Sequence, residues 1–92
     1  MKEETLRSYR ERVLRVLLHI QRHLDRELTL EELARVASFS PYHFHRIFTG
    51  MVGESVQEHI RRLRLERAAL SLRNGHRPVT ALAFAAGFAS HE

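Results

Sequence analysis

The stretch that decides the fold is residues 29–48, which read TLEELARVASFSPYHFHRIF. Thr29 is a good helix N-cap, and Glu32, three residues later, completes the T-x-x-E pattern of a capping box. Apolar residues then recur at helical spacing, at Leu30, Leu33, Ala34 and Ala37. The stretch therefore predicts a short helix that begins just after Thr29.

A second short helix is expected after the break Ser38-Phe39-Ser40. Ser40 can cap it, and Pro41 suits its first turn, where a missing backbone N–H costs nothing. Its bulky apolar face consists of Phe44, Ile47 and Phe48, while Tyr42, His45 and Arg46 lie off that face. Two helices joined by a tight turn, with an aromatic, a histidine and an arginine facing outward, predict a helix-turn-helix. The alternative is an αα-hairpin in an unrelated helical domain.

The composition is that of one small globular domain, or of two subdomains sharing one element. The chain has 92 residues, of which 43% are hydrophobic, and no cysteine. Without cysteine there is no disulfide framework, thiolate nucleophile or cysteine-type zinc site. No segment approaches the roughly 20 apolar residues of a membrane span, and no signal-peptide stretch precedes Leu6. We expect a cytoplasmic protein with no membrane partner.

The positive charge is concentrated in one part of the chain. Residues 1–32 carry seven basic and seven acidic side chains, and residues 74–92 carry one of each. Residues 33–73 carry seven arginines against three glutamates, so the net charge of +4 lies there. The planar guanidinium of arginine can form bidentate hydrogen bonds with a phosphate or with guanine. A charged segment is usually only a solvated face, but its overlap with a helix-turn-helix favours nucleic-acid binding.

Longer helices are expected on both sides of this motif. Apolar spacing predicts an amphipathic helix from about Thr5 to Leu24. Gly50 and Gly53 are expected to end the motif, and Glu54 or Ser55 to start a long helix that runs to Arg73 before the stop at Asn74-Gly75. The long helix has two apolar stripes on nearly opposite sides, which indicates two cores. The first comprises Val56, Ile60 and Leu63, and the second Leu65, Ala68, Ala69 and Leu72.

The end of the chain repeats the start of the motif. Leu33-Ala34, Ala37 and Phe39 match Leu82-Ala83, Ala86 and Phe88, each at an offset of 49. Pro78 would open this copy, and its second helix would begin near Ser90. The predicted organisation is therefore all-α, with a first helix-turn-helix subdomain at 1–53, a linking helix at 54–75, and the start of a second subdomain at 76–92.

Taken together, these segments resemble the DNA-binding domain of AraC-type transcriptional regulators. The resemblance covers essentially the entire chain. It is carried by TLEELA with its phenylalanine turn, by SPYHFHRIF, by the long helix GESVQEHIRRLRLERAA, and by the ending AFAAGFASHE. It implies a homeodomain-like bundle of seven helices, in which a long helix joins two helix-turn-helix units. It also implies that the helix around 41–50 enters the major groove of double-stranded DNA.

The resemblance assigns roles to individual residues. Base contacts fall on Tyr42, His45 and Arg46. Backbone contacts fall on Ser40, His43, Arg61 and Arg62. The start of the second reading helix falls on Ser90, His91 and Glu92.

Two departures from the family pattern affect these expectations. Gly50 stands where the family usually has a good helix former, so the reading helix is expected to end early. The second unit lacks about twenty residues, so self-association through the incomplete end and weak DNA binding are expected. RNA polymerase is a further expected partner, and the placement near residue 1 is similar to regulators with a downstream GyrI-like effector domain.

Other functions fit the residues less well. The second candidate is a helical protein-interaction module that does not bind DNA. No Gly-rich phosphate loop or catalytic constellation supports an enzyme. His19 and His23 are four residues apart, but no third metal ligand is evident, so neither a metal nor another cofactor is expected.

Overall fold

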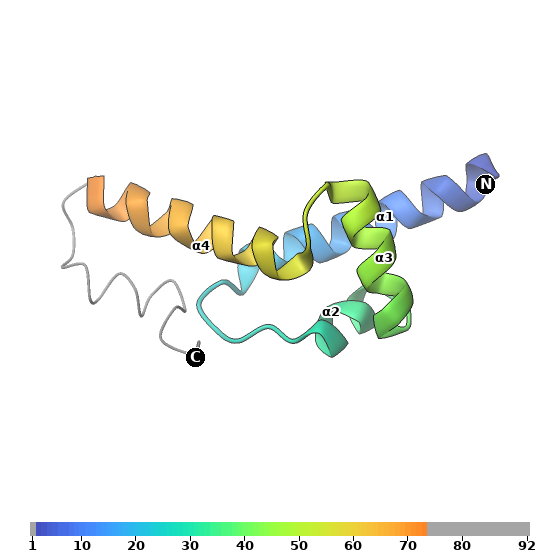
Figure 1. Cartoon of the computed structure of the whole chain (residues 1–92), viewed down its shortest axis with the longest axis horizontal. Coiled ribbons are helices and arrows are strands. Elements are labelled where there is room, and N and C mark those ends of the chain that lie inside the picture. Colours follow the sequence, from blue (N-terminus) through green and yellow to red (C-terminus); the bar gives the residue numbers. More distant parts are fainter. Residues whose placement is uncertain (1, 74–92) are drawn as a thin grey trace.

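The computed structural model describes residues 2–73, which form four α-helices and no strand within that range. They are α1 (Glu3–Arg22), α2 (Leu30–Ala37), α3 (Pro41–Val52) and α4 (Val56–Arg73). Figure 1 shows α2 and α3 packed beside the middle of α1, with α4 extending away from them. The all-α prediction is confirmed. No helix in this range is long and apolar enough to cross a membrane.

The first helix begins and ends two residues earlier than predicted. Glu3 and Glu4 occupy its first turn, where negative charge favours a helix N-terminus. Its apolar stripe buries Val13, Val16 and Ile20. Leu24, just beyond its end, is also buried, and Leu28 packs back onto the core.

All four helices contribute to one core. Phe44 and Phe48 of α3 are fully buried, and their ring centroids lie 5.6 Å apart. The remaining core side chains are Val13, Val16, Ile20, Leu24, Leu33, Ala34, Ala37, Val56 and Ile60. The start of α4 therefore shares the core of the helix-turn-helix, as its first apolar stripe predicts.

Beyond Arg64, no side chain of α4 is buried by the other described residues. Leu65, Leu70 and Leu72 are about half exposed. The predicted second core needs residues beyond Arg73. The Asn74-Gly75 stop, the repeat at 78–92 and the second reading-helix start all lie outside the described residues.

The expectation that α3 ends early at Gly50 is wrong. Helix α3 continues to Val52, and Gly53 caps it in the left-handed conformation with φ 91°. A glycine lowers helix propensity but does not by itself stop a helix. Termination needs a residue that adopts positive φ, and Gly53 supplies that conformation.

Candidate nucleic-acid interface

The turn between α2 and α3 is built by local hydrogen bonds. Ser38 adopts the left-handed conformation, with φ 59°. The N–H of Phe39 then donates to the Ala34 carbonyl at 2.9 Å, which closes the end of α2. Ser40 caps α3 as predicted, because its Oγ accepts from the His43 N–H at 3.3 Å. The predicted helix-turn-helix is therefore present.

The capping box at the start of α2 is only half formed. The Thr29 Oγ1 accepts from the Glu32 N–H at 3.1 Å. The Glu32 carboxylate does not return to Thr29. It accepts instead from Arg26 at 2.6 Å and contacts His19 Nε2 at 2.8 Å. These two contacts join α2 to the preceding loop and to α1.

Helix α1 braces the turn through Arg12 and Tyr9. The Arg12 Nε donates to the Ala37 carbonyl at 2.7 Å, and a second guanidinium N–H donates to the Ser38 carbonyl. The guanidinium lies 3.8 Å from the centroid of the Phe39 ring. The Tyr9 ring meets Phe39 edge-on at 5.0 Å. Sequence reasoning missed this brace, because its residues are too far apart in the chain to show a local pattern.

The outward face of α3 is defined by its buried phenylalanines. At about 100° per residue, Arg46 lies diametrically opposite the midpoint of Phe44 and Phe48. Tyr42, one turn earlier, is 73% exposed, and the Arg46 guanidinium lies 5.9 Å from its ring centroid. His45 is also exposed, at the edge of the same face. The structure thus brings the three expected base-contacting residues onto one accessible surface.

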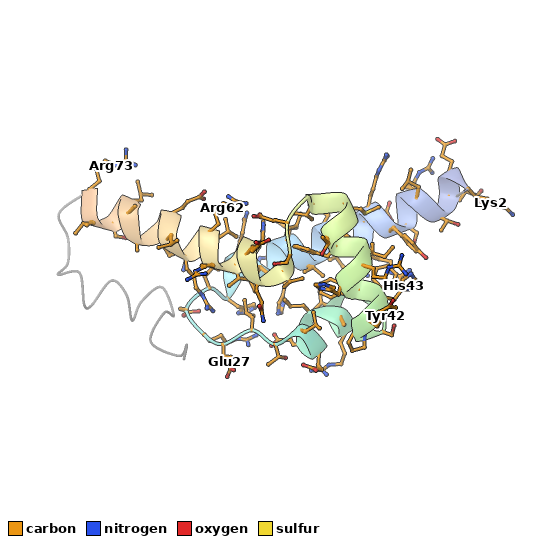
Figure 2. All side chains as sticks on the ribbon, viewed as in Figure 1. Lys2, Glu27, Tyr42, His43, Arg62 and Arg73 are labelled. Carbon is orange, nitrogen blue, oxygen red and sulfur yellow. The ribbon has the colours of Figure 1, made fainter. Side chains whose placement is uncertain are left out.

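His43 contacts two aromatic rings, those of Phe39 and Tyr9, which the sequence did not indicate. Its ring lies 5.0 Å from Phe39 and 5.9 Å from Tyr9, centroid to centroid, although the residue remains exposed overall. Figure 2 shows Tyr42 and His43 close together at the start of α3. His43 therefore belongs both to the brace and to the exposed start of α3.

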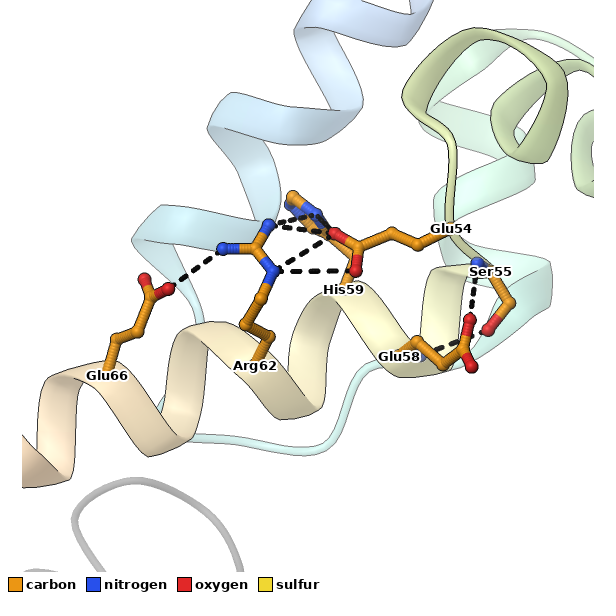
Figure 3. A network of polar contacts seen from close by, with 6 residues as sticks. All are labelled: Glu54, Ser55, Glu58, His59, Arg62 and Glu66. Atoms are coloured by element: carbon orange, nitrogen blue, oxygen red, sulfur yellow. Dashed lines mark hydrogen bonds and ion pairs between the residues drawn. The ribbon is translucent and has the colours of Figure 1, made fainter.

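Arg61 and Arg62 differ in their surroundings. Arg61 is exposed on α4. Arg62 forms ion pairs with Glu54 at 2.8 Å and with Glu66 at 2.9 Å, as Figure 3 shows. A phosphate would have to compete with both carboxylates for Arg62. Arg61 is thus the better placed of the two for a phosphate contact.

The α3–α4 junction is fixed by the same network. Ser55 and Glu58 form a complete capping box, with both reciprocal hydrogen bonds at 3.1 Å (Figure 3). His59 is buried, places its Nδ1 2.8 Å from a Glu54 carboxylate oxygen, and packs edge-on against Phe48. The start of α4 is therefore attached to the core and to the end of α3.

Arg64 is the other buried polar residue that the sequence did not indicate. It is 3% exposed, and it donates to the carbonyls of Leu24 at 3.1 Å and Arg26 at 2.7 Å. Burial lowers the pKa of Arg64 from its ordinary value. Because the Arg64 guanidinium lies inside, the segment 33–73 presents less positive charge to solvent than its arginine count suggests.

Two carboxylates have strongly perturbed pKa values. Hydrogen bonds from Arg26 and then His19 lower the pKa of Glu32 to about 2. Hydrogen bonds from Arg62 and then His59 lower the pKa of Glu54 to about 2. Both carboxylates act as links between elements. Among the described residues, no group of three or more histidine, cysteine or acidic side chains is placed to hold a metal ion.

Comparison with known proteins identifies this arrangement. A family described as a helix-turn-helix domain matches residues 33–92. An HTH-type transcriptional regulator of Bacillus subtilis, YbfP, is 42% identical over 64 residues, which cover 70% of this chain and 22% of that protein. The right origin-binding protein of Escherichia coli is 32% identical over 77 residues, which cover 84% of this chain and 27% of that protein.

A third relative is much shorter. The regulatory protein SoxS of Salmonella typhimurium is 27% identical over 85 residues, which cover 92% of this chain and 79% of SoxS. The chain thus spans about a quarter of the first two relatives and most of the third. The matched segment contains the helix-turn-helix, the long helix and the AraC-type motifs of the sequence. The chain belongs to the AraC-type helix-turn-helix family of transcriptional regulators.

Proposed function

We propose that this protein is a sequence-specific DNA-binding transcriptional regulator that inserts α3 into the major groove. The observation that supports this most directly is the outward face of α3, where Tyr42, His45 and Arg46 stand exposed opposite the buried Phe44 and Phe48. A major groove about 12 Å wide admits one α-helix. The net charge of +4 in residues 33–73 supplies attraction to DNA.

Each proposed contact follows from the chemistry of its side chain. Arg46 is suited to a bidentate contact with guanine O6 and N7. Tyr42 and His45 flank it on the same face. Ser40, the first amide groups of α3 and Arg61 are proposed to hold phosphates. His43 and Arg62 are proposed as weaker phosphate contacts, because both already have neighbours within the protein.

The wider role is proposed from family membership. We propose RNA polymerase as a further partner, location in the cytoplasm at the bacterial nucleoid, and no enzymatic activity. We also propose that Ser90, His91 and Glu92 begin a second reading helix. Self-association through the C-terminal segment is proposed for the chain as it stands.

The test begins with selection of preferred duplexes from a random-sequence DNA pool by the 92-residue chain. Arg46→Ala should then weaken binding to the selected site by about 1–3 kcal/mol and relax specificity at one base pair. Arg61→Ala should weaken binding about equally on all sequences, since a phosphate carries no sequence information.

Arg15→Ala is the matched control for lost charge. Arg15 is exposed on the side of α1 opposite its buried residues, so its removal should change affinity little. Equal effects of the Arg46 and Arg61 variants across a panel of sites would show that Arg46 contacts only phosphate. Selection of no duplex at low salt would instead favour a protein-interaction module.

A further inference from the structure

Arg12 and Tyr9, which brace the turn from α1, make none of the contacts proposed above, yet they hold the residues that fix the start of α3. Between the end of α2 at Ala37 and the start of α3 at Pro41, the chain has only three residues. Their conformation sets the angle between the two helices. One of them, Ser38, has positive φ without being glycine, a conformation that neighbouring contacts must stabilise.

Arg12 makes contacts with two of these three residues. Two of its guanidinium N–H groups donate to the backbone carbonyls of Ala37 and Ser38. The last carbonyls of a helix have no partner within the helix, so a cation at this position satisfies them and interacts favourably with the helix dipole. The same guanidinium lies 3.8 Å above Phe39, the next residue of the turn.

Tyr9 extends the brace to the reading helix itself. It lies one turn before Arg12 on α1, and its ring meets Phe39 at 5.0 Å with the two ring planes at 87°. It also meets the ring of His43, the third residue of α3, at 5.9 Å and 84°. Edge-to-face contacts of this kind have defined geometry, so they resist rotation of the turn.

A small change of angle at this turn would matter for recognition. Arg46 lies five residues beyond Pro41, roughly 7.5 Å along the helix axis. A tilt of α3 by about 10° at Pro41 would therefore displace the backbone of Arg46 by roughly 1 Å. Hydrogen bonds tolerate donor–acceptor distances of only about 2.7–3.2 Å. An unbraced α3 would lose its alignment with base edges before it lost its fold.

We propose that Arg12 and Tyr9 are positioning residues for DNA recognition, which set the angle of α3 through Ser38, Phe39 and His43 without contacting DNA. This inference rests on the proposed function, because it assigns a role in base reading by α3. On this proposal, Arg12 and Tyr9 affect how well the protein distinguishes one base sequence from another, and not how strongly its charges attract DNA. Loss of the brace should therefore reduce specificity while leaving the number of phosphate contacts unchanged.

The experiment compares Arg12→Ala, Arg12→Lys, Tyr9→Ala and Tyr9→Phe with the wild-type chain on its selected site and on single-base variants of that site. Arg15→Ala removes the same charge from the same helix outside the brace. Folded fractions are measured by circular dichroism at the assay temperature, and affinities are compared per folded molecule. Dissociation constants are recorded over a series of salt concentrations.

Arg12→Ala and Tyr9→Ala should lower discrimination between the selected site and its variants by about fivefold or more, which corresponds to roughly one lost base contact. Their log–log salt slopes should match the wild type. Tyr9→Phe, which keeps the ring, should behave as the wild type, and Arg12→Lys should recover part of the discrimination. Arg15→Ala should leave discrimination unchanged.

Three results would overturn the proposal. If folded Arg12→Ala keeps wild-type discrimination, the brace contributes only to stability. If its salt slope becomes shallower by about 0.9, Arg12 is itself a phosphate contact. A wild-type chain that selects no duplex would overturn both this inference and the proposed function, whereas wild-type selectivity with unaffected brace variants would overturn this inference alone.

Discussion

At the scale of single residues, Arg64 determines how α4 meets the rest of the domain. Its guanidinium crosses from α4 to the loop after α1 and donates to two backbone carbonyls there. A loop carbonyl that lost this donor and stayed away from water would cost free energy. The buried arginine therefore satisfies the loop and attaches α4 in the same set of contacts.

Arg64→Met is expected to lower the free energy of unfolding by about 1–3 kcal/mol, because the apolar stem is kept while two carbonyls lose their donor. The measurement is urea denaturation followed by circular dichroism, in which the midpoint should fall with an unchanged slope. Arg61→Met is the control on the same helix, since Arg61 is exposed and should change stability by no more than about 0.5 kcal/mol. Equal midpoints for the two variants would contradict the structural role of Arg64.

The sequence could not predict this residue, although it predicted the helix that carries it. Apolar periodicity places Val56 and Ile60 in the core, and both are buried. The same reasoning treats every arginine as a surface residue. The partners of Arg64 lie about 40 positions earlier in the chain, so no local pattern marks them. His59 was missed although its partners Glu54 and Phe48 lie nearby in the chain, because apolar periodicity does not mark a buried histidine.

At the scale of elements, capping chemistry was the most dependable part of the sequence analysis. Thr29 and Ser40 cap α2 and α3 as predicted, and the residues of α3 that were expected to contact bases lie on its exposed side. The failures arose where side chains had a choice of partner. The Glu32 carboxylate contacts Arg26 and His19 instead of completing the capping box with Thr29. Gly50 stayed helical because the next glycine provides the turn.

The carboxylates that connect elements predict sensitivity to acid. The folded-state pKa values of Glu32 and Glu54 are about 2, below the ordinary 4.5. Folding therefore favours their ionised forms, so the stabilisation is present above about pH 4.5 and is lost as the pH falls toward 2. Urea midpoints measured from pH 6 to pH 2 should decrease across that window.

Glu32→Gln and Glu54→Gln should each reduce this pH dependence, because the neutral amide does not titrate. Glu31→Gln provides the matched control, since Glu31 is an exposed neighbour on α2. It should leave the pH profile close to that of the wild type. A profile unchanged by all three substitutions would show that other groups cause the acid sensitivity.

At the scale of the whole molecule, intramolecular contacts reduce the charge that is available to DNA. Of the seven arginines in residues 33–73, Arg62, Arg64 and Arg67 already contact groups within the protein. The other four are exposed, at Arg35, Arg46, Arg61 and Arg73. The segment therefore offers about four exposed cations to DNA, of which Arg46 is proposed to contact a base and the others can contact phosphates.

The dissociation constant should consequently depend on salt with a log–log slope of about −2 to −4, and not the slope of about −6 that seven phosphate contacts would give. The measurement is a titration of the selected site between low and moderate salt. Arg61→Gln should make the slope shallower by about 0.9, whereas Arg62→Gln should change it little. A loss of about 0.9 in the Arg62 variant would show that its ion pairs open on DNA.

The shortness of α2 has a consequence for how the molecule acquires its fold. Helix α2 has eight residues and α3 has twelve, and isolated helices below about 12–15 residues are marginal in water. Neither can serve as a template for the other. Helix α1, with twenty residues, exceeds that length, and it supplies the surface against which the other two pack. Helices α2 and α3 should therefore form late, when they collapse onto α1, and the exposed face of α3 should assemble in the same step.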